Sequence, residues 1–121
     1  MKVPFVDLSR EASSISSELI AITSKVINSG QYISGPHLKL FEQKFAEFCG
    51  VKYAVGVGSG TDALFLSLKA LGIGSGDEVI TTTYTFYATI GAIVTSGAIP
   101  VFCDCNMDYN IDPEQIKNKI S

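Results

Sequence analysis

The sequence predicts an α/β fold in which two helices precede parallel strand–helix–strand units. Over residues 8–49 apolar residues recur at helical spacing, whereas from residue 53 onward short β-branched runs alternate with helical stretches. Strands that alternate with helices in this way form parallel units with right-handed crossovers. The 121 residues are 46% hydrophobic and 17% charged, which excludes disorder and indicates that some apolar faces are covered by other protein.

The first predicted helix spans residues 8–28. Asn28-Ser29-Gly30 ends it, because glycine readily adopts the left-handed conformation that follows a helix. The second helix begins at Pro36, where the missing amide hydrogen removes no hydrogen bond, and it ends at Gly50. Four residues form its apolar face: Leu38, Phe41, Phe45 and Phe48.

Three strands, each followed by a helix, are predicted after these two helices. The strands are Tyr53–Val57, Val79–Thr83 and Ile99–Cys103, and the helices are 62–71, 86–96 and a last one that opens at Asp112. At that last start, Asp112 is the N-cap, Pro113 occupies the first turn, and Gln115 is placed to bond back to the cap. A three-stranded parallel sheet leaves two exposed edges, so we expect the chain to be an incomplete part of a larger domain.

Charge and cysteine content exclude several classes of function. The net charge is −3 and the 9 basic residues are scattered, so no nucleic-acid-binding surface is expected. No apolar stretch suits a signal peptide or a membrane span, so we expect a cytoplasmic protein without a membrane partner. Cys49, Cys103 and Cys105 have no spacing typical of a disulfide framework. Cys103 and Cys105 share a face of the predicted strand, but with no third ligand nearby no metal site is predicted.

Three segments follow the predicted strands, at the edge where open α/β sheets bind ligands: Gly58–Thr61, Thr83–Phe86 and Asp104–Asn106. In the first segment, the glycines let backbone amides approach a ligand closely, and Thr61 adds a hydroxyl. The helix that opens at Asp62 directs its free amides and positive dipole end to the same place, which suits a phosphate. The alternative is a tight strand-to-helix turn in which glycine serves backbone geometry alone.

The glycine pattern does not identify the phosphate ligand. Gly58, Gly60 and Ala63 fit only the looser form of the dinucleotide-binding pattern, and no carboxylate ends the second predicted strand. A dinucleotide-binding module is therefore disfavoured. No lysine follows the glycines, which excludes a nucleotide P-loop. A phosphate on a different cofactor remains.

Tyr84, Phe86 and Tyr87 follow the end of the second predicted strand. Aromatic side chains there either form the flat wall of a pocket for a planar ring or pack in the core. The single histidine, His37, is interpreted as an exposed helix-start residue rather than a general base.

Seven stretches are spread in order over nearly all of the chain: Val3–Leu8, Ile33–Pro36 with Phe41-Glu42, Gly58–Leu64, Leu71–Ile80, Tyr84–Thr89, Gly97–Phe102 and Tyr109–Pro113. Together they resemble the N-terminal third of the DegT/DnrJ/EryC1/StrS family. Members of that family are pyridoxal-phosphate-dependent aminotransferases that act on nucleotide-linked keto sugars. Each stretch is weak alone, and together they are highly specific. One departure is Thr82-Thr83, where the family more often has Pro-Ser.

The resemblance implies the large domain of the fold-type-I pyridoxal-phosphate-dependent transferases. Residues 1–35 are then an N-terminal helical segment, and residues 36–121 are the first part of the large cofactor-binding α/β domain. The segments Pro4–Leu8 and Gly30–Gly35 are expected near the entrance for the sugar nucleotide, without an individual role for any residue.

The resemblance also implies which residues bind the cofactor. It assigns the phosphate of pyridoxal 5'-phosphate to Gly60, Thr61 and the amide of Asp62, in agreement with the argument from the helix start. It places Phe86 where the family stacks an aromatic ring on the pyridine ring of the cofactor.

The implied reaction transfers an amino group, usually from glutamate, to a nucleotide-linked keto-deoxy sugar for polysaccharide biosynthesis, in a homodimer. That chemistry needs a lysine that forms a Schiff base with the cofactor and a carboxylate that keeps the pyridine nitrogen protonated. In the family both lie beyond position 121, so no catalytic residue is predicted here and the chain alone is expected to be inactive. Two alternatives remain: a truncated, inactive remnant, and a dehydratase of the same family in which histidine replaces the lysine.

Overall fold

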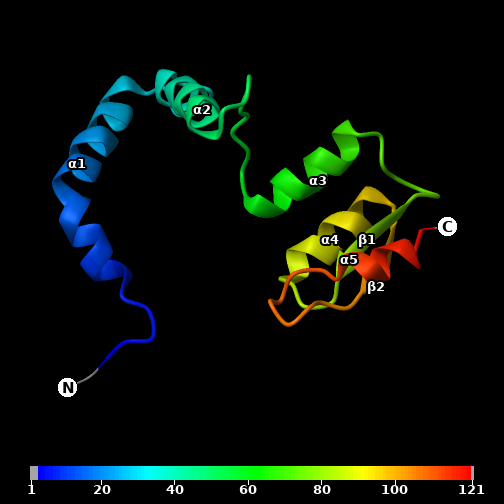
Figure 1. The fold of residues 1–121 in the computed structure, drawn as a ribbon. Coiled ribbons are helices and arrows are strands. Elements are labelled where there is room, and N and C mark those ends of the chain that lie inside the picture. The colour runs from blue at the N-terminus through cyan, green and yellow to red at the C-terminus, as the bar shows by residue number, and fades with distance from the viewer. Residues whose placement is uncertain (1–2, 121) are drawn as a thin grey trace. The chain divides into compact units, whose positions relative to one another are not determined.

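The computed structural model describes residues 3–120, which form five helices and two strands in the order α1, α2, α3, β1, α4, β2 and α5 (Figure 1). The chain forms two compact units, Met1–Gly56 and Val57–Ser121. The first unit contains α1 and α2, and the second contains the sheet and the other helices. Within residues 3–120, none of the helices combines the length and hydropathy of a membrane-spanning segment.

Helix α1, Leu8–Ser29, begins and ends as its local sequence predicts. The Asp7 carboxylate caps its start by accepting hydrogen bonds from the Ser9 hydroxyl at 2.7 Å and the Arg10 amide at 3.1 Å. The hydrogen bond from Ser9, and to a smaller extent the one from the Arg10 amide, holds the pKa of Asp7 below its ordinary value. Gly30 closes the helix in the left-handed conformation, with φ of 66°, which confirms the predicted stop.

Helix α2, Pro36–Cys49, also follows the prediction, with proline in its first turn and Gly50 in the left-handed conformation after its end. Its predicted apolar face carries a row of aromatic rings. Phe41 and Phe45 stack with their centroids 5.5 Å apart, and the centroid of Phe45 lies 6.3 Å from that of Phe48. All three rings are exposed, so this chain covers the aromatic face of α2 only lightly.

The predicted strand Tyr53–Val57 is not formed, and this part of the prediction is wrong. The Gly56 amide donates to Glu42 Oε1 at 2.8 Å instead of to a strand, and Tyr53 and Val55 are exposed. A strand needs a neighbouring backbone to complete its ladder, and the two strands within residues 3–120 pair with each other. Within residues 3–120 no strand pairs with this segment, and β-propensity without a pairing partner does not form a strand.

The sheet consists of two parallel strands, β1 (Glu78–Thr82) and β2 (Ile99–Cys103), which pair along their full length. Both confirm predicted strands, although β1 begins and ends one residue earlier than expected. Helix α4, Tyr87–Ser96, is the crossover between them, and Gly97 ends it with φ of 92°. One of the predicted parallel strand–helix–strand units is therefore present.

The core of the second unit lies where α4 packs against the sheet. Helix α4 contributes three buried apolar residues to it: Ala88, Ala92 and Ile93. The alanines keep the helix surface narrow, which allows helix and strands to approach closely. Ser96, also buried, satisfies its hydroxyl by donating to the Ile93 carbonyl at 2.7 Å.

Helix α3, Gly60–Ala70, packs beside α4 and runs in the same direction. The Lys69 ammonium in the last turn of α3 donates at 3.3 Å to the carbonyl of Ser96, the last residue of α4, so the two helices end side by side. Helix α4 joins two parallel strands and therefore starts where β1 ends. Helix α3 also starts at this carboxyl edge of the sheet, and Figure 1 shows the starts of α3 and α4 on the same side of the unit.

Helix α5, Pro113–Lys117, begins at the predicted N-cap but without the predicted reciprocal hydrogen bond. The Asp112 carboxylate accepts from the Glu114 amide at 3.0 Å. The Gln115 side chain accepts from the Asp104 amide at 3.0 Å, because the Asp112 amide already donates to the Asp104 carbonyl at 3.1 Å. The start of α5 is thereby tied to the residue that follows β2.

All three cysteines are free thiols. Cys103 is buried at the end of β2, whereas Cys105 lies beyond the strand, half-buried, and forms an isolated antiparallel bridge with Ile111. The prediction that both lie on one strand is therefore wrong, because β2 ends at the first of them. Among residues 3–120, no group of three or more His, Cys, Asp and Glu side chains is placed to hold a metal ion.

Candidate phosphate-binding site

The first turn of α3 leaves two backbone amides without a partner inside the helix. Ser59 is the N-cap: its hydroxyl accepts from the Asp62 amide at 3.1 Å, and its carbonyl accepts from the Ala63 amide at 3.0 Å. The amides of Gly60 and Thr61 lie between Ser59 and Asp62 in the sequence. No helical carbonyl precedes them, so neither amide has an acceptor within the helix. Free amides at the positive end of a helix dipole bind anions such as a phosphate group.

The structure gathers the predicted site residues of this segment in one turn. Helix α3 begins at Gly60 rather than at the predicted Asp62, so Gly60, Thr61 and Asp62 occupy its first three positions, all of them exposed. The Asp62 amide, predicted to donate to the phosphate, donates to Ser59 here. The open donors are therefore the amides of Gly60 and Thr61.

The two glycines that flank Ser59 differ in what surrounds them. A Cβ added to Gly58 would lie 2.7 Å from Asp62 Oδ2, so the Asp62 carboxylate folds back over this glycine. A Cβ added to Gly60 would meet nothing within 4 Å. The missing side chain at position 58 makes room for the carboxylate, whereas the space beside position 60 is open to a ligand.

Ser59 is the capping residue of this candidate site that the sequence analysis did not identify. The signal was present, because a serine followed three residues later by an acidic residue is typical of a helix start. By occupying the Asp62 amide, Ser59 determines which amides of this turn stay open.

Replacing Ser59 with alanine is expected to lower the free energy of unfolding by about 1 kcal/mol, because the Asp62 amide loses its cap. Chemical denaturation followed by circular dichroism measures this change. Ser67→Ala is the matched control, since its hydroxyl donates to the Ala63 carbonyl within the same helix at 2.7 Å and caps no end. An equal loss in both variants would contradict the capping role.

Phe86, the fourth predicted site residue, lies at the start of α4 on the carboxyl edge of the sheet. It is the N-cap residue without a side-chain cap, and it is 70% exposed. Its ring meets the ring of Tyr87 edge to face, with the centroids 4.8 Å apart. Within this chain the Phe86 ring is accessible, on the edge at which α3 also begins.

A third segment reaches the same edge from the end of β2. Tyr109 lies in the loop between β2 and α5, and its ring packs against that of Tyr84 with the centroids 5.4 Å apart. The segments that follow β1 and β2 are thus joined at the carboxyl edge, as parallel strands require. The sequence analysis placed Tyr84 there but did not identify Tyr109.

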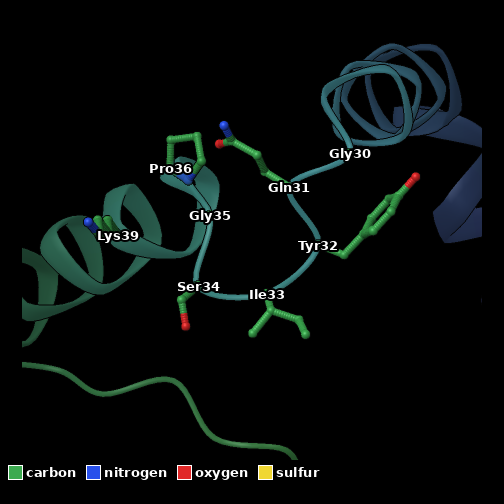
Figure 2. Close-up of a pocket in the computed structure, with 8 residues that line it drawn as sticks. All are labelled: Gly30, Gln31, Tyr32, Ile33, Ser34, Gly35, Pro36 and Lys39. Atoms are coloured by element: carbon green, nitrogen blue, oxygen red, sulfur yellow. The ribbon is translucent and has the colours of Figure 1, made fainter.

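The loop between α1 and α2 lines an open hollow of about 560 Å³ in the first unit (Figure 2). Its lining comprises residues 30–36 and Lys39. Figure 2 shows the Tyr32 ring pointing back toward α1, where its hydroxyl donates to the Ile27 carbonyl at 3.1 Å. This is the segment that the resemblance places near a sugar-nucleotide entrance, and Lys39 adds a cation that the sequence analysis did not name.

Comparisons with known proteins match this chain to a family and to solved structures. The sequence profile of the DegT/DnrJ/EryC1/StrS aminotransferase family matches residues 13–121. The dTDP-3-amino-3,6-dideoxy-alpha-D-galactopyranose transaminase of Aneurinibacillus thermoaerophilus is 43% identical over 98% of this chain and 33% of its own length. The chain spans about a third of the length of such curated relatives.

Solved structures share the fold as well. The structure of S. venezuelae DesV in complex with a ketimine intermediate is 41% identical, with a TM-score of 0.96 over 99% of this chain and 33% of that one. GDP-4-keto-6-deoxymannose-3-dehydratase with a trapped PLP–glutamate geminal diamine is 30% identical, with a TM-score of 0.74 over 81% of this chain and 27% of that one.

Proposed function

The chain belongs to the DegT/DnrJ/EryC1/StrS aminotransferase family, and from this premise we propose that it forms the phosphate- and ring-binding part of a pyridoxal-phosphate site. The observation that supports this most directly is the open first turn of α3. Two free amides, the Thr61 hydroxyl and the positive end of the helix dipole converge there, beside open space at Gly60. These groups suit the dianionic phosphate of the cofactor.

Each predicted residue then has a distinct part. The amides of Gly60 and Thr61 and the Thr61 hydroxyl donate to the phosphate oxygens. The Asp62 amide lies in the same turn and donates to Ser59; when the phosphate is bound, we propose that it also donates to a phosphate oxygen. The exposed ring of Phe86 flanks the pyridine ring and restricts how it tilts.

Pyridoxal phosphate, when bound, supplies a ring that withdraws electrons from the carbon bearing the amino group. The residues of this chain anchor and orient that ring, and we assign no catalytic residue among them. We therefore expect the 121-residue chain alone to catalyse no transamination. The division into a helical segment 1–35 and the first part of the large domain, 36–121, stays a proposal of the same kind.

The proposed reaction transfers an amino group from glutamate to a nucleotide-linked keto-deoxy sugar. It is supported by transaminases that are 41–43% identical to this chain and are named for dTDP-linked amino sugars. We propose a homodimer for the protein that performs it.

Dehydration of a keto sugar is the second candidate function. Its support is the match to a GDP-4-keto-6-deoxymannose-3-dehydratase structure, at 30% identity. Both reactions use a phosphate anchor of this kind, so the residues of this chain serve either one. The higher identity to transaminases favours amino transfer.

The proposed function is tested on the natural protein, purified at the length that its cells make and weighed by intact mass spectrometry. Pyridoxal phosphate binding is measured by absorbance, and nucleotide-linked keto-deoxy sugars are incubated with glutamate. We expect bound cofactor and a sugar product in which an amino group replaces the keto oxygen. A deoxygenated, nitrogen-free product would establish the dehydratase instead, and a protein that binds no pyridoxal phosphate would overturn both. The 121-residue chain, which we expect to show no activity, is measured alongside.

A further inference from the structure

The loop between β2 and α5 forms a tight turn held at both ends. Inside it, the Asn106 amide donates to the Asn110 carbonyl at 2.8 Å, and the Tyr109 amide donates to the Asn106 carbonyl at 2.9 Å. At its base, the Cys105–Ile111 bridge joins the two sides of the loop. These bonds therefore hold the loop in a defined conformation.

Tyr109 occupies a position in this turn that disfavours a tyrosine. Its φ is 65°, in the left-handed region where a side chain other than that of glycine, asparagine or aspartate is uncommon. The neighbouring Asp108 carboxylate accepts from the amide and the side chain of Asn110, both at 3.1 Å, and these bonds hold the backbone in place. An asparagine or glycine would adopt the same conformation with less strain, so the turn itself does not call for an aromatic ring.

The Tyr109 ring has one marked partner, the ring of Tyr84. The two rings are 69% and 66% exposed in this chain. Among the hydrogen bonds, ion pairs and ring contacts that residues 83–86 make within the described part of the chain, only this contact reaches farther than four positions along the sequence. The loop after β1 is thus braced by Tyr109, two residues before Phe86.

We propose that Tyr109 is a positioning residue: by packing on Tyr84 it holds segment 83–86, and with it the Phe86 ring, in place at the carboxyl edge beside the start of α3. This inference rests on the proposed function, because it assumes that Phe86 flanks the pyridine ring. On this interpretation, the contact that the Tyr109 ring makes compensates for the strain of its left-handed backbone.

Two substitutions separate the ring from the backbone. Tyr109→Phe keeps the ring and the strain, whereas Tyr109→Asn removes the ring and suits the left-handed conformation. In the natural protein we expect Tyr109→Phe to bind pyridoxal phosphate as the unaltered protein does. Tyr109→Asn should melt at an equal or higher temperature, yet bind pyridoxal phosphate about 2- to 10-fold more weakly and shift the absorption maximum of the bound cofactor. A purely structural role would not combine retained stability with weaker binding.

Tyr84→Leu is the partner variant, because it removes the other ring of the pair. If the rings act as a unit, Tyr84→Leu and Tyr109→Asn together weaken pyridoxal phosphate binding less than the product of their separate effects. Unchanged affinity and absorption in Tyr109→Asn would overturn the positioning role, as would fully additive losses. Gly60→Asp is measured alongside to distinguish the phosphate-site proposal from the proposal about Tyr109. If Gly60→Asp abolishes binding while Tyr109→Asn has no effect, only the positioning role of Tyr109 is wrong. If neither changes binding, the phosphate site at α3 is wrong.

Discussion

Replacing Gly60 with aspartate is expected to abolish pyridoxal phosphate binding by the natural protein while leaving its fold intact. A side chain at this position meets open space, and a carboxylate in the first turn of a helix is favoured by the helix dipole. The same carboxylate would face the cofactor phosphate. Two like charges about 4 Å apart near a protein surface repel by roughly 4 kcal/mol, which corresponds to a loss of affinity of about 1000-fold.

The control for this substitution is Gly60→Asn, which adds nearly the same volume without the charge. Titration with pyridoxal phosphate gives the affinities, and thermal melting confirms that both variants fold. We expect both side chains to take up part of the open space beside position 60, so that Gly60→Asn loses some affinity and Gly60→Asp, which adds a charge, loses much more. If both variants fold and bind pyridoxal phosphate as tightly as the unaltered protein does, a phosphate site at the start of α3 is refuted.

Thr61→Ala should weaken retention of the cofactor without removing it. The Thr61 hydroxyl is exposed at the second helical position, beside the free amides, where it donates to a charged phosphate in the proposed site. Losing a hydrogen bond to a charged group costs roughly 1.5–3 kcal/mol, or about 10- to 150-fold in affinity. The dissociation constant of pyridoxal phosphate measures the effect directly.

Ser67→Ala is a matched control, because it removes a hydroxyl from the same helix that already donates to the Ala63 carbonyl. Its affinity for pyridoxal phosphate should equal that of the unaltered protein. Thr61→Ser, which restores a hydroxyl, should recover most of the affinity. If Thr61→Ala binds the cofactor as tightly as Ser67→Ala does, the assignment of the Thr61 hydroxyl to the phosphate is wrong.

Much of the candidate site could be predicted before the fold was known. The glycines, Thr61 and the helix that follows indicated an anion site, and the structure places the Gly60 and Thr61 amides open at a helix start. The helix start itself was misplaced by two residues, because the cap at Ser59 was overlooked although its pattern is local. Phe86 was placed correctly at the start of α4, but whether its ring was buried required the structure.

Structural features that depend only on a residue and its near neighbours could be predicted from the sequence. Gly30, Gly50 and Gly97 end their helices in the left-handed conformation, because that backbone geometry is set by the residue itself. The β-branched runs of β1 and β2 on either side of an apolar helix likewise predicted a parallel pair. Membership of the family was indicated in the same way, by short motifs in a fixed order.

Features that depend on distant partners required the folded molecule. Tyr53–Val57 has the composition of a strand, yet its Gly56 amide bonds to the Glu42 side chain, 14 positions earlier in the sequence. The Gln115 side chain bonds to the Asp104 amide instead of to the nearby Asp112, and the Tyr109 ring packs against the ring of Tyr84. A backbone or side-chain group bonds to whatever the fold brings within about 3 Å, and sequence spacing does not specify that neighbour.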